Sequence, residues 1–261
     1  MSSFAAKYER DGYASPVEIL SETEAAVHRQ SLEAAETQHG ALHYKAKMHT
    51  VMPSAWQMAT HPKVLDAVEA ILGPDILLYD VGFIIKEPQT PSFVSWHQDL
   101  TFWGLSDDAQ VSLWLALSPA TEDSGCMRMI PGSHKDGRYA HGTSEDDDNV
   151  LLQAQTVAGV DETRAVHCPL RPGEASFHHG WTLHASMPNK SNDRRIGLNA
   201  QYLAPSVRQT KHDHDTAILV RGEDRFGHFG VDTPAQADFA PEVMDHWRLL
   251  NQLHVDTQGT M

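Results

Sequence analysis

Short β-rich segments dominate the chain between residues 76 and 203, and they limit the folds open to it. The segments are rich in β-branched and aromatic residues and are separated by Gly, Pro, Asn and Asp. Short strands joined by turns are typical of antiparallel sandwiches and jelly rolls. The sequence therefore predicts a mainly β core, with strands at residues 76–85, 93–99, 111–117, 126–130, 174–177, 182–186 and 196–203.

Helical patterns lie on both sides of this core. One helix is expected from Val17 to Thr37, a stretch rich in Glu, Ala and Leu, with the pair Ser15-Pro16 as its cap and first-turn residue. A second is expected from Pro62 to Leu72, because its apolar residues follow helical spacing. A last helix is predicted from Pro241 to Val255.

The chain shows no internal repeat and no convincing linker, so one domain is expected over residues 1–261. It would consist of a mostly helical part (1–75), a β core (76–205) and a C-terminal extension (206–261). A polar insert with little periodicity, residues 135–166, interrupts the core. Long loops within compact domains often act as lids, which is the role expected for this insert.

Composition excludes several classes of partner. The net charge is −15, from 35 acidic and 20 basic side chains, so electrostatic repulsion disfavours nucleic acid and anionic membranes as partners. No apolar run approaches the roughly 20 residues that span a bilayer, and the first residues do not form a secretory signal. Two cysteines, Cys126 and Cys168, without short spacing suit a reducing compartment. A cytoplasmic protein, monomer or homodimer, is expected.

The stretch FVSWHQDLTFW places His97 and Asp99 two residues apart in an expected strand. Residues at this spacing point to the same face of a strand. Two histidines and one carboxylate form the facial triad of non-haem Fe(II) oxygenases, although an isolated pair is more often hydrogen-bonded than metal-bound. His184 is a candidate for the second histidine, and Arg195, eleven residues later, could hold a dicarboxylic acid through two hydrogen bonds.

These motifs together resemble the phytanoyl-CoA dioxygenase superfamily of Fe(II)- and 2-oxoglutarate-dependent oxygenases, in its bacterial forms. The resemblance covers most of the chain, and the motifs match in order and spacing: IIKEP, VSWHQDLTFW, VSLWLAL, DSGCMRMIPGSHKDG, PGEASFHHGWTLHASMPNKSNDRRIGL and LVRGEDRFGHF. It implies a double-stranded β-helix core, the jelly roll shared with cupins, with N-terminal and C-terminal helices.

The resemblance also implies roles for individual residues. His97, Asp99 and His184 match the iron ligands, and Arg195 matches the residue that binds the distal carboxylate of 2-oxoglutarate. The other implied cosubstrate residues are Ser186 and Trp114, which would line its pocket, Gln98 and Asn189, which would lie near it, and either Lys45 or Lys47 in the YKAKMH stretch, between which the sequence does not decide.

The implied function is hydroxylation of an unactivated C–H bond in a small or medium-sized metabolite, using Fe(II), 2-oxoglutarate and O₂ and releasing succinate and CO₂. A carboxylate at Asp99 disfavours halogenation, since halogenating relatives have a small residue there. Organophosphonates, betaine-like or amino-acid solutes and natural-product intermediates all stay open as substrates.

Two other functions compete: a non-catalytic jelly roll that binds a metal or small ligand, and a cupin-like metalloenzyme that does not use 2-oxoglutarate. Arg195 with Ser186 favours the dioxygenase.

Several other polar residues can be interpreted either as functional or as structural. Strand alternation turns one of Tyr79 and Asp80 inward; an inward Asp80 could meet a cationic substrate, and a solvent-facing carboxylate is at least as good an interpretation. One of the pair His178-His179 could support the site or simply pack. The stretch Lys211–Asp215 resembles a metal tract, but a solvated loop is the better interpretation.

Overall fold

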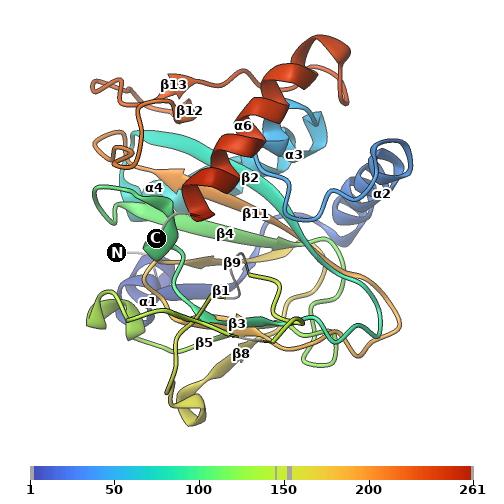
Figure 1. Ribbon diagram of the computed structural model, residues 1–261, viewed down its shortest axis with the longest axis vertical. Coiled ribbons are helices and arrows are strands. Elements are labelled where there is room, and N and C mark those ends of the chain that lie inside the picture. Colours follow the sequence, from blue (N-terminus) through green and yellow to red (C-terminus); the bar gives the residue numbers. More distant parts are fainter. Residues whose placement is uncertain (1–2, 145, 152–154, 260–261) are drawn as a thin grey trace.

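The computed structural model describes residues 3–144, 146–151 and 155–259. The chain begins with a mainly helical part, followed by β strands and a final helix (Figure 1). The N-terminal elements are α1 (Ser3–Asp11), β1 (Tyr13–Glu18), α2 (Glu22–His39), the short 3₁₀ helix η1 (Met48–Thr50), α3 (Pro53–Ala59) and α4 (Pro62–Leu72).

The helix predicted from Val17 starts later than expected. Ser21 is its N-cap and forms a capping box with Glu24, so α2 begins at Glu22. The prediction for Ser15-Pro16 was wrong, because these residues lie in strand β1, which pairs with β9 at the edge of the larger sheet. An edge strand tolerates proline, whose missing N–H removes no interior ladder bond.

All seven predicted strands are present, each within a few residues of the expected bounds. They are β2 (Ile76–Lys86), β3 (Val94–His97), β4 (Gln110–Ala116), β5 (Met127–Met129), β9 (Glu174–His178), β10 (His184–Ser186) and β11 (Arg195–Leu203). The further strands are β6 (Gly142–Thr143), β7 (Gln155–Thr156), β8 (Val166–Cys168), β12 (Thr216–Arg221) and β13 (Gly230–Val231). The mainly β jelly-roll prediction is confirmed.

The strands form one large and one smaller sheet. The large sheet has the order β1-β9-β4-β11-β2-β12-β13, and the smaller one has the order β3-β10-β5-β8. Apart from the β12–β13 pair, neighbouring strands in both sheets are antiparallel. In Figure 1 the strands of the smaller sheet lie below those of the larger one.

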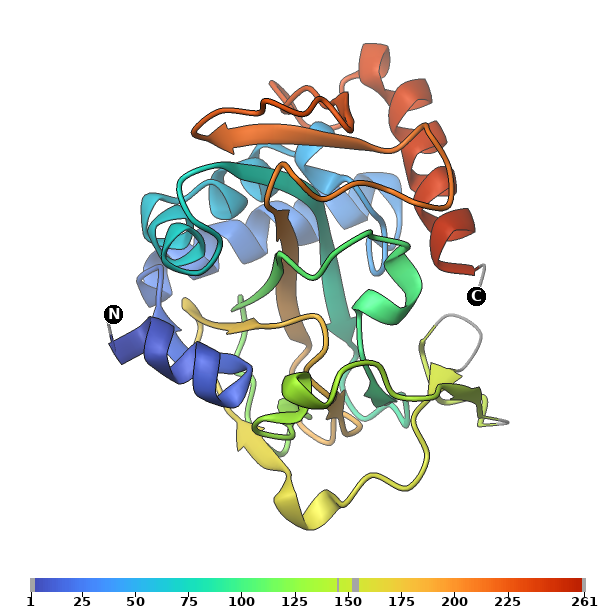
Figure 2. The ribbon, with the colours of Figure 1, turned by 90° about the vertical axis from the view of Figure 1, so that its left-hand side faces the viewer.

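Alternation along the strands gives the large sheet two different faces. On β4, Val111, Leu113 and Leu115 belong to the main hydrophobic core, which also contains apolar residues of α2, α3 and α4. These helices therefore cover the outer face, and Figure 2 shows them, in blue, along one side of the sheet. The residues between them in sequence, including Trp114, point to the inner face, where a cavity lies.

The insert and the last helix contribute to the walls of that cavity. The insert, residues 135–166, includes the end of η2 (Ser133–Asp136), β6, β7 and η4 (Glu162–Arg164), but residues 145 and 152–154 lie outside the described part. Its Leu151 and Gln155 line the cavity, and a lid role for it stays a prediction. The helix predicted at Pro241 is confirmed as α6 (Pro241–Gly259), which runs beyond the expected end. None of the helices in the described ranges has the length and apolarity needed to cross a membrane.

One partly buried histidine couples stability to pH. His43 accepts a hydrogen bond from the Ile85 N–H at 2.9 Å, and burial lowers its pKa to about 4. An unfolded histidine titrates near 6.5, so the unfolded chain binds this proton more readily, and the free energy of unfolding falls as pH decreases from about 6.5 to about 4. A shift of this size corresponds to on the order of 3 kcal/mol.

We therefore expect Tm to decrease over this pH interval, and the decrease to be shallower in His43→Asn, which keeps an acceptor near Nδ1 but does not titrate. Thermal unfolding followed by circular dichroism at a series of pH values measures both slopes. Equal slopes in the two proteins would contradict the assignment.

Candidate metal centre

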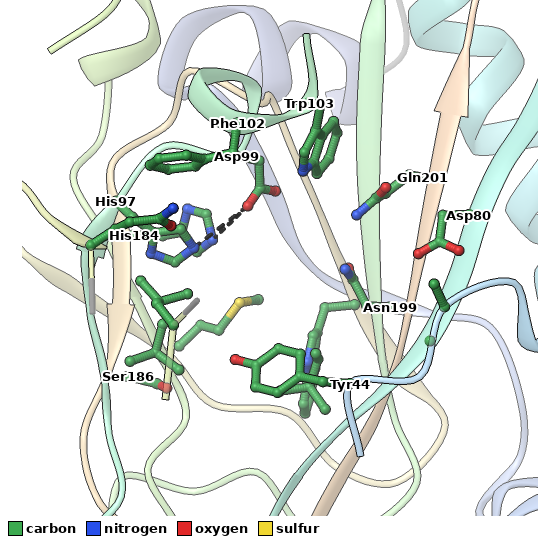
Figure 3. A pocket seen from close by; sticks show the side chains of 18 of the residues that line it. Tyr44, Asp80, His97, Asp99, Phe102, Trp103, His184, Ser186, Asn199 and Gln201 are labelled. Carbon is green, nitrogen blue, oxygen red and sulfur yellow. Dashed lines mark ion pairs between the residues drawn. The ribbon is translucent and has the colours of Figure 1, made fainter. Parts of the chain in front are cut away.

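Three side chains from two segments meet at one point of the cavity. His97 ends β3 and is the register partner of His184, which begins β10. The Nε2 atoms of His97 and His184 lie 3.5 and 3.7 Å from the same Asp99 Oδ1. In the described part of the chain, this is the one group of three or more His, Cys, Asp or Glu side chains whose ligand atoms are close enough to share a metal ion. Figure 3 shows both rings facing the carboxylate.

Asp99 reaches this point by a different route from the one predicted. The strand ends at His97, and Asp99 has helical backbone angles at the N-cap of the short helix α5 (Leu100–Trp103). Its proximity to His97 therefore comes from the turn into α5 and not from the two-residue period of a strand. In a continuous strand, Asp99 would instead lie two residues beyond His97, roughly 7 Å further along the strand.

Backbone carbonyls orient both imidazoles. The Nδ1 atom of His97 lies 2.9 Å from the Ser95 carbonyl, and that of His184 lies 3.0 Å from the Thr182 carbonyl. Each Nδ1 can donate only if it carries the proton, which leaves an unprotonated Nε2 facing Asp99. Burial, reinforced by neighbouring His97, lowers the pKa of His184 to about 3, so its ring is neutral at pH 7. Two neutral imidazoles and a carboxylate suit a divalent transition metal.

The second oxygen of Asp99 has partners of its own. Oδ2 accepts a hydrogen bond from Ser112 Oγ at 3.1 Å and lies 3.2 Å from His178 Nε2. Burial opposes ionisation of this carboxyl, but His184, His178 and His97 outweigh it and hold its pKa well below the usual range. His178 thus faces the site, one of the two readings open from the sequence. Ser112 was missed, although its place between Val111 and Leu113 indicates an inward side chain.

Arg195 lies fully buried at the start of β11. Its guanidinium carbon is 4.6 Å from the centre of the Trp114 ring, and its Nε and Nη1 have no hydrogen-bond partner among the residues that the structure describes. Burial lowers its pKa to about 10, so it stays charged at pH 7. A buried cation with two free donors is costly unless an anion binds it, which fits a ligand carboxylate. Gly197 makes the stacking possible, because a Cβ there would lie 2.0 Å from the Trp114 ring.

Lys86, in the IIKEP motif, is a site residue that sequence reasoning missed. Its Nζ donates to Ser186 Oγ at 2.7 Å and to the Ser186 carbonyl at 3.1 Å. Burial, together with the charge of Arg195, lowers the pKa of Lys86 to about 6. Lys86 is the register partner of Arg195 on the adjacent strand, so the two side chains start from neighbouring positions.

The other predicted residues divide into two groups. Ser186, Trp114 and Lys45 line the cavity. Gln98, Asn189 and Lys47 do not line it in the described structure. The amide of Gln98 joins the 137–139 segment to Trp181, Asn189 closes the turn before Arg195, and the Lys47 ammonium lies on two backbone carbonyls and Asp232. Of the two lysines left open, the structure brings Lys45 to the cavity.

The cavity continues from the triad along the inner face of the large sheet. Figure 3 shows Asn199, Gln201 and Asp80 on the side away from His97 and His184, with the rings of Trp103 and Tyr44 nearby. Asn199 and Gln201 alternate with Leu198, Ala200 and Tyr202 of the core, a period-2 pattern that marks both amides as inward.

Comparisons with known proteins agree with this architecture. A family model described as phytanoyl-CoA dioxygenase (PhyH) matches residues 8–197. A probable alpha-ketoglutarate-dependent hypophosphite dioxygenase of Stutzerimonas stutzeri is 31% identical over 144 residues, 54% of this chain and 50% of that protein. The peroxisomal phytanoyl-CoA dioxygenase of Homo sapiens is 26% identical over 152 residues, 56% of this chain and 45% of that protein. The chain therefore matches about half the length of these curated relatives.

A solved structure extends the likeness to almost the whole chain. The apo form of ThoJ, a non-heme monooxygenase, superposes with a TM-score of 0.85 at 30% identity and covers 98% of both chains. The family model alone spans well over half of the residues, including β3, α5 and β10, which hold the triad. The chain belongs to the phytanoyl-CoA dioxygenase (PhyH) family.

Proposed function

We propose that the chain is an Fe(II)- and 2-oxoglutarate-dependent dioxygenase that hydroxylates a C–H bond of a small or medium-sized molecule. The observation that carries the proposal is the conjunction of the His97–Asp99–His184 group with a buried Arg195 that has two unpartnered donors. A metal site alone would fit many enzymes. A free, buried guanidinium in the same cavity calls for a carboxylate ligand.

In the proposed reaction, the substrate, 2-oxoglutarate and O₂ yield the hydroxylated product, succinate and CO₂. One oxygen atom of O₂ enters the product and the other enters succinate. Iron bound by His97, Asp99 and His184 would supply the redox chemistry. The protein's own residues bind and orient the reactants and limit the access of water.

Each part of the chain has a definite task in this scheme. The Ser95 and Thr182 carbonyls hold the rings of the two histidines so that Nε2 faces the metal position. Arg195 would bind the distal carboxylate of 2-oxoglutarate, while Trp114 holds the guanidinium in place. Ser186, whose Oγ is held by Lys86, would contribute a donor from the cavity wall, where Lys45 also lies. Asp99 as a ligand favours hydroxylation over halogenation.

Two alternatives are distinguished by the same site. A non-catalytic binding protein has no need for a buried dicarboxylate receptor beside its metal ligands. A cupin-like metalloenzyme that does not use 2-oxoglutarate would leave the Nε and Nη1 atoms of Arg195 without partners. Both are therefore less consistent with the geometry than the dioxygenase.

Anaerobic protein supplied with Fe(II) and 2-oxoglutarate is expected to develop a weak visible metal-to-ligand charge-transfer band. The band requires the ferrous ion and the keto acid on the same centre, so a visible spectrum measures both at once. Succinate in place of 2-oxoglutarate is the control and should give no band. Iron binding without the band would favour the metalloenzyme that does not use 2-oxoglutarate, and no iron binding by folded protein would contradict the metal site itself.

The cytoplasm is the proposed location. It is supported by Cys126 and Cys168, both buried and both free thiols. The proposed partner is a small-molecule substrate, and the chain is proposed to act as a monomer or homodimer.

A further inference from the structure

A row of polar side chains crosses the inner face of the large sheet beside the metal centre. Backbone register places His178 of β9 opposite Ser112 of β4, Ser112 opposite Gln201 of β11, and Gln201 opposite Asp80 of β2. Side chains of register partners lie on the same face. The first two members hold Asp99. Gln201 and Asp80 continue the row away from it, on β11 and β2.

Gln201 and Asp80, the second half of the row, are buried, and within the described ranges their side-chain oxygens do not all have hydrogen-bond donors. Gln201 is 4% exposed, and its Oε1 has no hydrogen-bond partner among the described residues. Asp80 is 6% exposed, and its Oδ1 accepts one hydrogen bond, from the Lys47 N–H at 2.6 Å. Both residues line the cavity. A buried acceptor without a partner is unfavourable, so these atoms are expected to meet donors on a bound molecule.

In the part of the chain that the structure describes, the positively charged side chains near Asp80 do not form hydrogen bonds with its carboxylate. The Lys47 ammonium is directed elsewhere, to two backbone carbonyls and Asp232. The one ion-pair partner of Asp80 in the described ranges is His254, whose Nε2 lies 3.8 Å from Oδ2, beyond hydrogen-bond distance. A carboxylate with a vacant acceptor position, beside an amide oxygen, is suited to a charged N–H donor.

We propose that Asp80 and Gln201 bind a protonated amine of the substrate, and so select a cationic molecule whose other part extends toward the metal centre. The inference rests on the proposed function, since it concerns the substrate of that reaction. Figure 3 shows the two residues adjacent and opposite His97 and His184 across the cavity. The aromatic rings of Trp103 and Tyr44 border the space between and would cover the apolar part of such a molecule.

The cosubstrate does not compete for this end of the cavity. Arg195 and Asp80 lie on adjacent strands, but Arg195 pairs with Lys86, whereas Asp80 pairs with Gln201. The two pairs lie six residue steps apart on β11, roughly 20 Å along a strand. One end of the inner face is therefore cationic and the other end accepts hydrogen bonds. An anion would bind at Arg195, and an ammonium group would bind at Asp80.

The test is direct binding of matched probes to metal-free protein without 2-oxoglutarate. n-Hexylamine, n-hexanol and n-hexanoate share a chain and differ in head group, and isothermal titration calorimetry measures each dissociation constant. We expect hexylamine to bind about 10- to 100-fold more tightly than hexanol, the range of a hydrogen bond to a charged group. In Asp80→Asn, which keeps an acceptor for the Lys47 N–H, this preference should disappear while hexanol binding is unchanged.

Two further variants complete the test. Gln201→Glu adds a second carboxylate beside Asp80 and should tighten hexylamine binding. Asp245→Asn removes the same charge from a side chain that is 97% exposed, and should leave all three constants unchanged. Undetectable hexylamine binding, equal affinities for amine and alcohol, or an unchanged preference in Asp80→Asn would each overturn the proposal. Since no iron or keto acid is present, failure here is separate from failure of the charge-transfer test.

Discussion

The His97→Ala variant is expected to lose Fe(II)-dependent succinate formation almost completely. Removing this imidazole leaves two ligands, Asp99 and His184, for the metal. Loss of an outer-shell partner typically costs roughly 10- to 100-fold in metal affinity or activity, and loss of a ligand should exceed that range. The measurements are succinate release under air and Fe(II) binding under anaerobic conditions.

The fold should survive this change. Within the described ranges, the one hydrogen bond of the His97 ring outside the ligand group goes to the Ser95 carbonyl, so circular dichroism and Tm should stay close to those of the unmodified chain. His167→Ala is the matched control, because that ring is half-exposed and distant in sequence from the triad. Unmodified turnover in His97→Ala would show that the ligand assignment is wrong, and the same holds for Asp99→Ala.

The Arg195→Ala variant is expected to raise the apparent KM for 2-oxoglutarate by about 100-fold or more, since each hydrogen bond to a charged group contributes roughly 1.5–3 kcal/mol. Fe(II) affinity should change little, because Arg195 is not one of the three proposed ligands and its guanidinium stacks on Trp114. Steady-state kinetics with varied 2-oxoglutarate, together with anaerobic Fe(II) titration, separate the two quantities.

Two variants isolate the charge from the packing. Arg195→Met keeps much of the side-chain volume beneath Trp114 and should show the same rise in KM. Arg194→Ala removes the adjacent arginine, which pairs with Glu36 and Glu87 near the surface, and should leave KM unchanged. Equal losses of iron and 2-oxoglutarate affinity in Arg195→Ala would mean that the arginine is structural.

Much of the fold was predictable, because strands and turns have local signals. β-rich composition between turn residues identified β4 and β11, and helical spacing identified α4. The N-terminal strand β1 was not predictable in this way. Its residues include Ser15-Pro16, which locally indicate a helix start, and they form a strand only because β9 supplies the partner.

The site residues also divide into those that local motifs predicted correctly and those whose role depends on distant contacts. His97, Asp99, His184 and Arg195 came from motifs, and the structure brings the first three together with Arg195 on the wall of the same cavity. Gln98 and Asn189 belong to the same motifs, yet their amides hold neighbouring loops. A motif records that a residue type is needed at a position, but it does not separate contact with a ligand from support of the backbone.

Asp80 illustrates what alternation alone leaves open. Beside it, the register between β2 and β11 shifts at Gln201 and Tyr202. Such a bulge changes which face a side chain occupies, so counting along the strand could not decide between Tyr79 and Asp80.

The sequence by itself predicted the jelly-roll class, the three side chains proposed to bind the metal and the arginine proposed to receive a dicarboxylate, because these depend on residue types in recognisable motifs. The tertiary structure alone decided that the turn into α5, and not a strand, brings Asp99 to the histidines, and that Lys86, Ser112 and His178 support the site. It also decided that Asp80 meets Gln201 inside the cavity. Register and bulges between strands distant in sequence set these distances, and no local pattern encodes them.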